Sequence, residues 1–309
     1  MSDYYNEISY GNFSVDGTVL GWYSSSYSMT EAQSDARSYV SELAYLADND
    51  INYANYDNDG PDNIPNSGDD DGYVDFLFIV VRSTPPGFII GEATGIARLG
   101  LGTDYQSNDV SLSGGNIRIR ADGSSRGTGG SVQQGRNFDE AVGSMAHEFG
   151  HYLGLPDLYD TSALQESINP EEESAGIGDW GILGHGNRGW NERGGPNPFS
   201  AWSLAQLGWL GFENDQLIVV ESDMENILLD DVIEGGSVYM LHESVSQRYY
   251  LVEFRSRRAS YYERNLPAEG LLIWHVNPLA AGNENERNPL VELVCADGQY
   301  ADAGFPLGQ

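Results

Sequence analysis

Residues 137–160 read NFDEAVGSMAHEFGHYLGLPDLYD, and this stretch decides how the rest of the chain is interpreted. Apolar side chains recur in it every three or four residues, as they do on the core-facing side of an amphipathic helix: Phe138, Val142, Met145 and Phe149. Asn137 and Glu140 have the spacing of a capping box. The sequence therefore predicts a helix over residues 138–153 that begins next to Asn137.

Two histidines occupy this helix one turn apart. His147 and His151 stand at positions i and i+4, so their imidazoles project from the same face and can bind one metal ion. Glu148 follows the first histidine directly, which places a carboxylate beside the metal without making it a ligand. This HExxH pattern is typical of metallopeptidases, in which the glutamate is the general base.

The residues after the helix supply a third ligand. Gly154 is suited to the left-handed conformation that ends a helix, so the chain can turn back and bring Asp157 to the metal. Two imidazoles, one carboxylate and an open position are typical of a catalytic zinc site. A structural site would usually contain cysteines, and Cys295 is the only cysteine. Either histidine alone is better explained as an ordinary surface or core residue, but the full HExxHxxGxxD set favours zinc.

These residues resemble the immune inhibitor A-like secreted zinc metallopeptidases, relatives of the metzincins with Asp in place of the usual third His. The resemblance extends over nearly the whole chain, through SDYYNEISYGNFSVDGTVLGWY, YDNDG, DDDGYVDFLFIVV, GDWGILGHG, PFSAWSLAQLGWL, YYLVEFR and GLLIWHVN. It implies an α+β, zincin-like or metzincin-like, two-lobed catalytic domain. It also implies that His147, His151 and Asp157 are the zinc ligands and that Glu148 is the catalytic base.

The resemblance also implies a domain organisation and a setting. Residues 1–309 form one peptidase unit, with an upper lobe over 1–154, a lower lobe over 155–212 and a β-rich C-terminal part over 213–309. We expect a secreted, extracellular endopeptidase that acts on proteins or peptides. The start MSDYYNEISYGNF lacks the charged and apolar regions of a signal peptide. A leader or propeptide would therefore be absent from this chain.

The chain departs from metzincin-like enzymes in the turn below the metal. Leu183 stands where those enzymes have methionine, so the apolar character is kept and the thioether is lost. His185 follows two residues later, near the position at which some relatives carry a tyrosine. We expect His185 to stabilise the oxyanion of the reaction, although a solvent-facing loop histidine explains the sequence equally well.

A dense acidic segment precedes the apolar run FLFIVV. Its carboxylates form a DxD…DGxxD pattern if the intervening residues bulge outward, and hard oxygen ligands at this density suit Ca²⁺; the predicted ligands are Asp57, Asp59, Asp69, Asp71 and Asp75, with Asp62 and Asp70 as further contributors. The alternative is a solvated acidic loop without an ion.

The composition limits the partners of the protein. The chain contains 47 Asp and Glu residues against 15 Lys and Arg, all of them arginine, and its net charge is -32. Such a charge repels nucleic acid and anionic lipid, and no apolar run is long enough to span a membrane. The one basic cluster, formed by Arg255, Arg257, Arg258 and Arg264 with Glu253 and Glu263 between them, is predicted to be a solvated, internally paired face. The excess of acid indicates a halophilic protein.

Other segments give weaker structural predictions. Residues 8–25 read as strands and turns, a helix is expected from Thr30, and FLFIVV is typical of a fully buried strand. Residues 116–122 are predicted to be an edge strand that pairs with the substrate backbone. A short helix is expected within residues 199–210, and strands are expected at 237–243, 248–254, 270–276 and 291–296.

Two other functions remain open. A catalytically inactive, calcium-stabilised surface or adhesion module of the same fold would share most of these features. A metal hydrolase that acts on a bond other than a peptide bond would share the ligand set. A serine hydrolase is disfavoured because no GxSxG motif is present.

Overall fold

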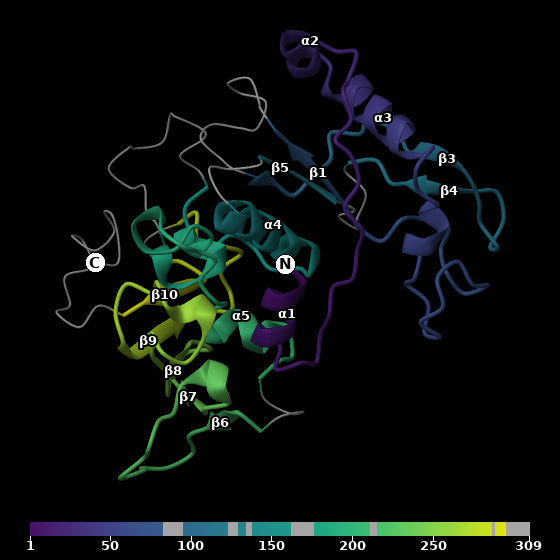
Figure 1. Cartoon of the computed structure of the whole chain (residues 1–309). Helices are drawn as coiled ribbons and strands as arrows, with labels where there is room; N and C mark the ends of the chain where they lie inside the picture. Colours follow the sequence, from purple (N-terminus) through teal and green to yellow (C-terminus); the bar gives the residue numbers. More distant parts are fainter. Residues whose placement is uncertain are drawn as a thin grey trace. The chain divides into compact units, whose positions relative to one another are not determined.

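The computed structural model describes residues 1–82, 95–122, 129–133, 138–161, 176–210, 215–285 and 288–294 (Figure 1). The chain divides into two compact units. Unit 1 consists of Met1–Val15 and Asn137–Gln309, and unit 2 of Asp16–Arg136. Helices and sheets occur in both units, which confirms the α+β class. The three-part division at residues 154 and 212 stays a prediction.

A five-stranded sheet dominates the C-terminal part of unit 1 (Figure 1). The order is β10-β9-β8-β7-β6, with all neighbours antiparallel except the parallel pair β6 and β7. The strands are β6 (Leu217–Val219), β7 (Val238–His242), β8 (Tyr249–Arg255), β9 (Gly270–Val276) and β10 (Val291–Leu293). The strands predicted in this region are confirmed, although Cys295 lies outside the described residues.

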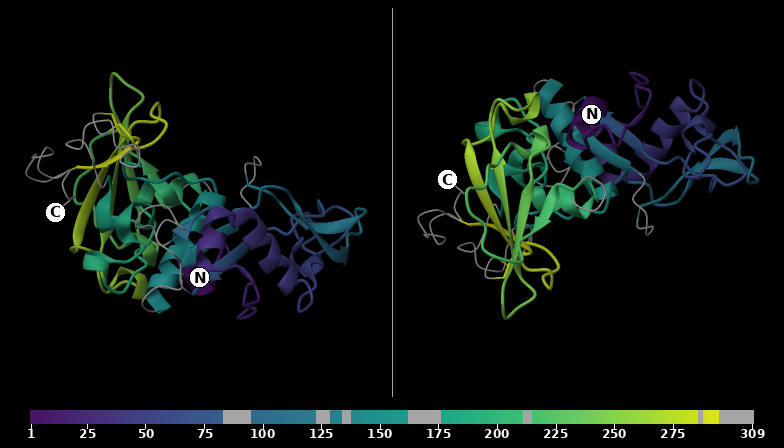
Figure 2. Two further views of the ribbon diagram at one scale, coloured as in Figure 1. Left: turned by 90° about the horizontal axis from the view of Figure 1, so that it is seen from above. Right: turned by 90° about the horizontal axis from the view of Figure 1, so that it is seen from below.

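One face of this sheet is covered by the helices of unit 1 (Figure 2). Helix α5 (Ala201–Gln206) begins at Ser200, whose side chain accepts a hydrogen bond from the backbone NH of Ser203. The helix packs against β8 and β9. It lies within the segment where a short helix was predicted. The described residues of unit 1 also contain the short helical turns η4 (Gly178–Trp180), η5 (Ile182–Gly186), η6 (Trp190–Glu192), η7 (Val232–Glu234) and η8 (Tyr261–Glu263).

The prediction that the basic cluster is a solvated face is wrong for its central residues. Glu253, Arg255 and Glu263 are fully buried. The guanidinium of Arg255 lies 3.5 Å from Glu253 and 3.2 Å from Glu263, so the predicted internal pairing is confirmed. The alternation of β8 places positions 251, 253 and 255 on the covered face of the sheet. Charged residues at two of those positions must therefore pair within the core.

Helix α4 (Phe138–Tyr152) confirms the central prediction. It ends in a Schellman motif: Gly154 has φ of +95°, the Leu155 NH donates to Gly150 O (3.1 Å) and the Gly154 NH donates to His151 O (2.9 Å). Val142 and Phe149 are buried as expected, whereas Phe138 is 80% exposed, so the predicted apolar stripe does not include it. Asn137, and with it the predicted capping box, lies outside the described residues.

The N-terminal segment folds as a helix rather than as strands. Helix α1 (Ser2–Ile8) buries Tyr4, Tyr5 and Ile8 completely. A seven-residue helix is marginal on its own, so tertiary packing of these side chains determines its conformation. Residues 13–25 contain neither helix nor strand, which contradicts the predicted strands there.

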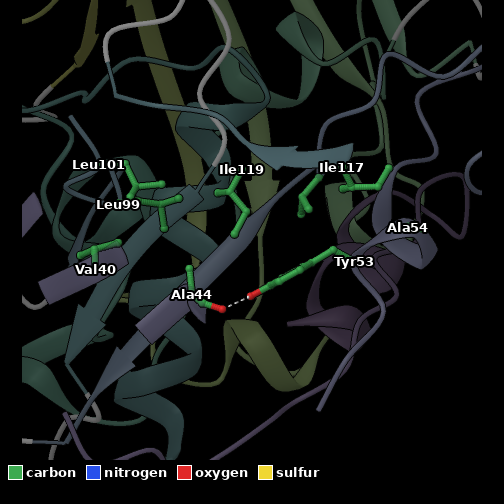
Figure 3. Close-up of a cluster of buried hydrophobic side chains, with 9 residues drawn as sticks. Val40, Ala44, Tyr53, Ala54, Leu99, Leu101, Ile117 and Ile119 are labelled. Atoms are coloured by element: carbon green, nitrogen blue, oxygen red, sulfur yellow. Dashed lines mark hydrogen bonds between the residues drawn. The ribbon is translucent and has the colours of Figure 1, made fainter. Parts of the chain in front are cut away.

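Unit 2 surrounds a separate apolar core (Figure 3). The core gathers Val40 and Ala44 from α3 (Ala36–Ala47), Ile117 and Ile119 from β4 (Asn116–Ile119), and Tyr53 from η1 (Tyr53–Tyr56). The Tyr53 hydroxyl donates to the Ala44 carbonyl at 3.1 Å. The predicted helix from Thr30 is two helices, because α2 (Met29–Ser34) is capped by Ser28 and α3 by Asp35.

The apolar run FLFIVV forms strand β1 (Leu77–Val81), which is parallel to β5 (Gly129–Gln133); β5 in turn pairs antiparallel with β2 (Gly95–Ile96). Within this strand only Val81 is buried and Val80 is exposed, so the prediction of a fully buried strand is wrong. In the sheet of described strands, β1 has a neighbour on one side only.

Strand β4 pairs antiparallel with β3 (Tyr105–Val110) and was predicted to bind the substrate backbone. The Arg118 NH instead donates to Gly72 O (3.0 Å), and Arg118 O accepts from the Val74 NH (2.9 Å). The outer edge of β4 is therefore already occupied at this residue, which contradicts the predicted role.

None of the described helices has both the length and the apolar character needed to cross a membrane.

Candidate metal centre

Helix α4 places the two histidines on one face. Their rings are 4.9 Å apart and nearly perpendicular. His147 is buried, whereas His151 is half-buried and remains partly accessible to solvent. The i, i+4 spacing predicted from the sequence thus produces a pair of convergent imidazoles.

Backbone carbonyls hold both rings. His147 Nδ1 lies 2.7 Å from Ile182 O, and His151 Nδ1 lies 2.8 Å from Leu155 O. A carbonyl oxygen only accepts hydrogen bonds, so each Nδ1 carries the proton and each Nε2 keeps a lone pair. Such contacts to the distal nitrogen are the usual support of histidines that bind metals.

Asp157 completes the set. Its Oδ1 lies 3.1 Å from His147 Nε2 and 3.4 Å from His151 Nε2. The three ligand atoms fall within 4.8 Å of one another. Asp157 Oδ1 is buried and accepts no hydrogen bond from the described residues. Three potential ligand atoms this close together suit a cation, and two imidazoles with one carboxylate are a donor set that zinc prefers.

The pKa values of His151 and Asp157 also favour a cation at this site. Burial opposes charge on both groups, but the Asp157 carboxylate next to His151 raises the pKa of the imidazole to about 9. The two histidines lower the pKa of Asp157 despite its burial. The centre therefore takes up positive charge readily, whether as a proton or as a metal ion.

The turn η5 lies against the metal-binding helix. Leu183 is buried, and a Cβ placed on Gly150 would be 2.9 Å from Leu183 Cδ2. Leu183 O also accepts the NH of Leu158 at 2.7 Å, the residue after Asp157. This turn therefore supports His147 through Ile182 and Asp157 through Leu158. Leu183 thus places a buried apolar side chain in this turn, as expected from the sequence.

Glu148 is buried beside the three ligand residues. Burial raises the pKa of its carboxyl group, while the charges of His147 and His151 lower it and that of Asp157 raises it further. A carboxyl group with a raised pKa is better suited to accept and return a proton near neutral pH than an ordinary glutamate.

Two more side chains lie near the ligands. The Tyr159 ring is 6.4 Å from the His147 ring and 5.1 Å from the His185 ring. Burial and the charges of Asp157 and Glu148 raise the pKa of Tyr159. His185 is exposed, yet desolvation by the surrounding protein, followed by the charge of His147, lowers the pKa of its imidazole. Sequence reasoning missed Tyr159, although its position two residues after a ligand was a usable signal.

A second group of carboxylates lies in unit 2. Ligand atoms of Asp57, Asp59 and Asp70 fall within 4.8 Å of one another. Asp57 is fully buried, and its Oδ1 has no hydrogen-bond partner among the described residues, while Oδ2 accepts from the Gly72 NH at 3.1 Å. Asp75 lies close enough to interact electrostatically with Asp59 and Asp70.

The other predicted calcium ligands have different partners. Asp71 pairs with Arg120 at 2.6 Å, and Asp69 accepts from the Ser67 hydroxyl. Burial, followed by repulsion from neighbouring carboxylates, raises the pKa of Asp57 and of Asp75 to about 6. The loop therefore concentrates negative charge around a buried oxygen.

The helix with its paired histidines, the glycine turn and the returning aspartate have the arrangement that is typical of metallopeptidase sites. A sequence model described as "Immune inhibitor A peptidase M6, catalytic domain" matches residues 1–210. The chain belongs to the immune inhibitor A peptidase family, as its sequence motifs predicted.

Characterised relatives agree with this assignment. The "Pre-pro-metalloprotease PrtV" of two Vibrio cholerae serotype O1 strains is 30% identical to the chain over 250 residues. The match covers 72% of this chain and 25% of the relative, so the chain spans about a quarter of the length of the curated relatives it matches.

Proposed function

We propose that the chain is the catalytic domain of a secreted zinc endopeptidase. The observation that carries the proposal is the convergence of His147 Nε2, His151 Nε2 and Asp157 Oδ1 on one point, with both Nδ1 atoms held by carbonyls. A bound zinc ion would supply Lewis acidity, which lowers the pKa of a water and polarises the scissile carbonyl.

The residues around the ligands perform the proton transfers. Glu148 accepts a proton from the attacking water on its buried carboxylate and delivers it to the leaving amine. Its raised pKa favours both halves of this exchange near neutral pH. His185 lies beside Tyr159 at the centre, and we assign it the role of stabilising the developing oxyanion.

The wider setting is part of the same proposal. The Vibrio relatives are called pre-pro-metalloproteases, a term for a precursor form, which supports a secreted enzyme. Family membership supports protein or peptide substrates and a two-lobed zincin arrangement. An inactive adhesion module is less well supported, because it would not require a buried glutamate beside three convergent ligands.

A calcium ion in unit 2 is a second, structural proposal. The buried and unpartnered Asp57 Oδ1, together with Asp59 and Asp70, supports it. Asp75 would complete a set of four, whereas Asp69 and Asp71 have other partners and are left out of the proposed set. A cation here would offset the repulsion that raises the pKa of Asp57 and Asp75.

The enzymatic proposal is tested by metal analysis together with a cleavage assay. The purified chain should contain one zinc per molecule and cleave an unfolded protein substrate internally. A chelator should abolish cleavage, and added zinc should restore it. Full activity in the absence of any metal would refute the proposal.

A further inference from the structure

Helix α4, which carries His147 and His151, is contacted by the N-terminal segment of the same unit. The Tyr5 hydroxyl of α1 donates to Ala146 O at 2.6 Å. The Tyr5 ring also packs edge-on against Phe149, at a centroid distance of 5.1 Å. Ala146 and Phe149 are three residues apart, so Tyr5 contacts one stripe of α4.

This contact is buried and crowded. Tyr5 is fully buried, and its ring also contacts Phe13, Phe199 and Trp209 at 5.9 to 6.3 Å. The Tyr5 hydroxyl has little freedom to choose another acceptor. Loss of the hydroxyl would remove a buried hydrogen bond that ties α1 to the Ala146 carbonyl, which permits the helix to shift.

The contact is also placed at a sensitive point. Ala146 immediately precedes His147, whose Nδ1 is held by Ile182 O on another side. Consecutive residues of α4 are thus anchored by two segments distant in sequence, one from α1 and one from η5. Shifts of a few tenths of an ångström between these anchors change how the histidine nitrogens meet Asp157.

We propose that Tyr5 is a positioning residue of the metal centre, which holds α4 where His147 and His151 reach Asp157. The inference rests on the proposed zinc site. It assigns to the N-terminal segment a role in metal affinity in addition to its role in the core.

The test compares Tyr5→Phe with Tyr10→Phe. Tyr10 belongs to the same segment, and its hydroxyl donates to Val232 O at 2.8 Å, away from α4. Both variants lose one hydrogen bond to a backbone carbonyl, so both should lose comparable thermal stability. Zinc affinity, measured by competition with a chromogenic chelator, should weaken about tenfold in Tyr5→Phe only. Equal zinc affinities in the two variants would overturn the proposal.

If Tyr5→Phe does not fold, a second pair of variants, with non-natural amino acids at position 5, tests the role of the hydroxyl. With 4-aminophenylalanine at position 5 the amino group donates a hydrogen bond, whereas 4-methylphenylalanine fills the same space without donating. Zinc affinity should be near the native value in the first and reduced in the second. Equal affinities would overturn the role of the hydroxyl. Native protein that fails to bind zinc at all would refute the proposed function, and this inference with it.

Discussion

Gly143 of α4 lies directly against the backbone of Asn187, so closely that a Cβ at position 143 would overlap the Asn187 carbonyl. Asn187 follows η5, the turn whose Ile182 and Leu183 carbonyls hold His147 and Leu158. Helix α4 and the residue that follows η5 are therefore in backbone contact one helical turn before His147. A side chain at position 143 must separate them.

Gly143→Ala should accordingly destabilise unit 1 although alanine favours helices by about 1 kcal/mol over glycine. Overpacking against a backbone group should lower the free energy of unfolding by about 1–3 kcal/mol and weaken zinc binding. Urea unfolding and zinc titration measure both effects. Gly150→Ala is the control, because its neighbour is the movable side chain of Leu183 at 2.9 Å. An unchanged or more stable Gly143→Ala protein would contradict the contact.

The buried carboxyl group of Glu263 should make stability depend on pH. Burial, with Asp231 and Glu253 nearby and despite Arg255, raises the pKa of Glu263 to about 8. The folded state therefore binds more protons than the unfolded state between the ordinary glutamate pKa and about pH 8. Stability is full below this range and falls as pH rises, with a slope that approaches 1.4 kcal/mol per pH unit.

Glu263→Gln should flatten this slope, because an amide does not titrate. Chemical unfolding at a series of pH values from 4 to 9 measures it. Glu234→Gln changes an exposed residue of η7 and should leave the slope as it is. A slope that survives in Glu263→Gln would assign the pH dependence to other groups.

Calcium should stabilise unit 2 if the acidic loop binds it. Asp57→Asn removes a carboxylate that burial disfavours, so the ion-free variant should be at least as stable as the native protein. The melting temperature of Asp57→Asn should no longer rise with millimolar calcium. The melting temperature of the control Asp16→Asn, which changes an exposed residue, should still rise. Calcium-dependent stabilisation of Asp57→Asn equal to that of the native protein would argue against this site.

High salt should stabilise the whole chain. Salt screens the self-repulsion that accompanies a net charge of -32. The free energy of unfolding should therefore rise from low to molar concentrations of sodium or potassium chloride. Stability that stays constant or falls over this range would contradict a halophilic adaptation.

The grouping of residues in the candidate metal centre could be predicted because it is local in the sequence. His147, Glu148 and His151 share one helical turn, and Gly154 and Asp157 follow within six residues of His151. The carbonyl of Ile182 that orients His147 was not predictable, because no sequence pattern reports which backbone oxygen reaches a side chain across the fold. Tyr159 was missed for a related reason: its ring lies between residues 147 and 185.

Burial was the harder property to predict. Arg255 and Glu253 resemble surface residues by type, but their alternation with Leu251 along β8 places them in the core. Conversely, Val80 is apolar and yet exposed on β1. Helix α1 was unexpected because its Tyr-rich sequence has no strong helix preference, and the contacts of Tyr4 and Tyr5 with distant aromatic residues stabilise it.

The most direct test of the account is the cleavage rate and zinc content of Glu148→Gln. The variant should bind one zinc through His147, His151 and Asp157, which are unchanged, and lose peptide cleavage by at least about a hundredfold, since the general base is gone. Glu140→Gln, which changes another buried glutamate of α4, should retain activity. Zinc-loaded Glu148→Gln that cleaves at the native rate would contradict the proposed mechanism.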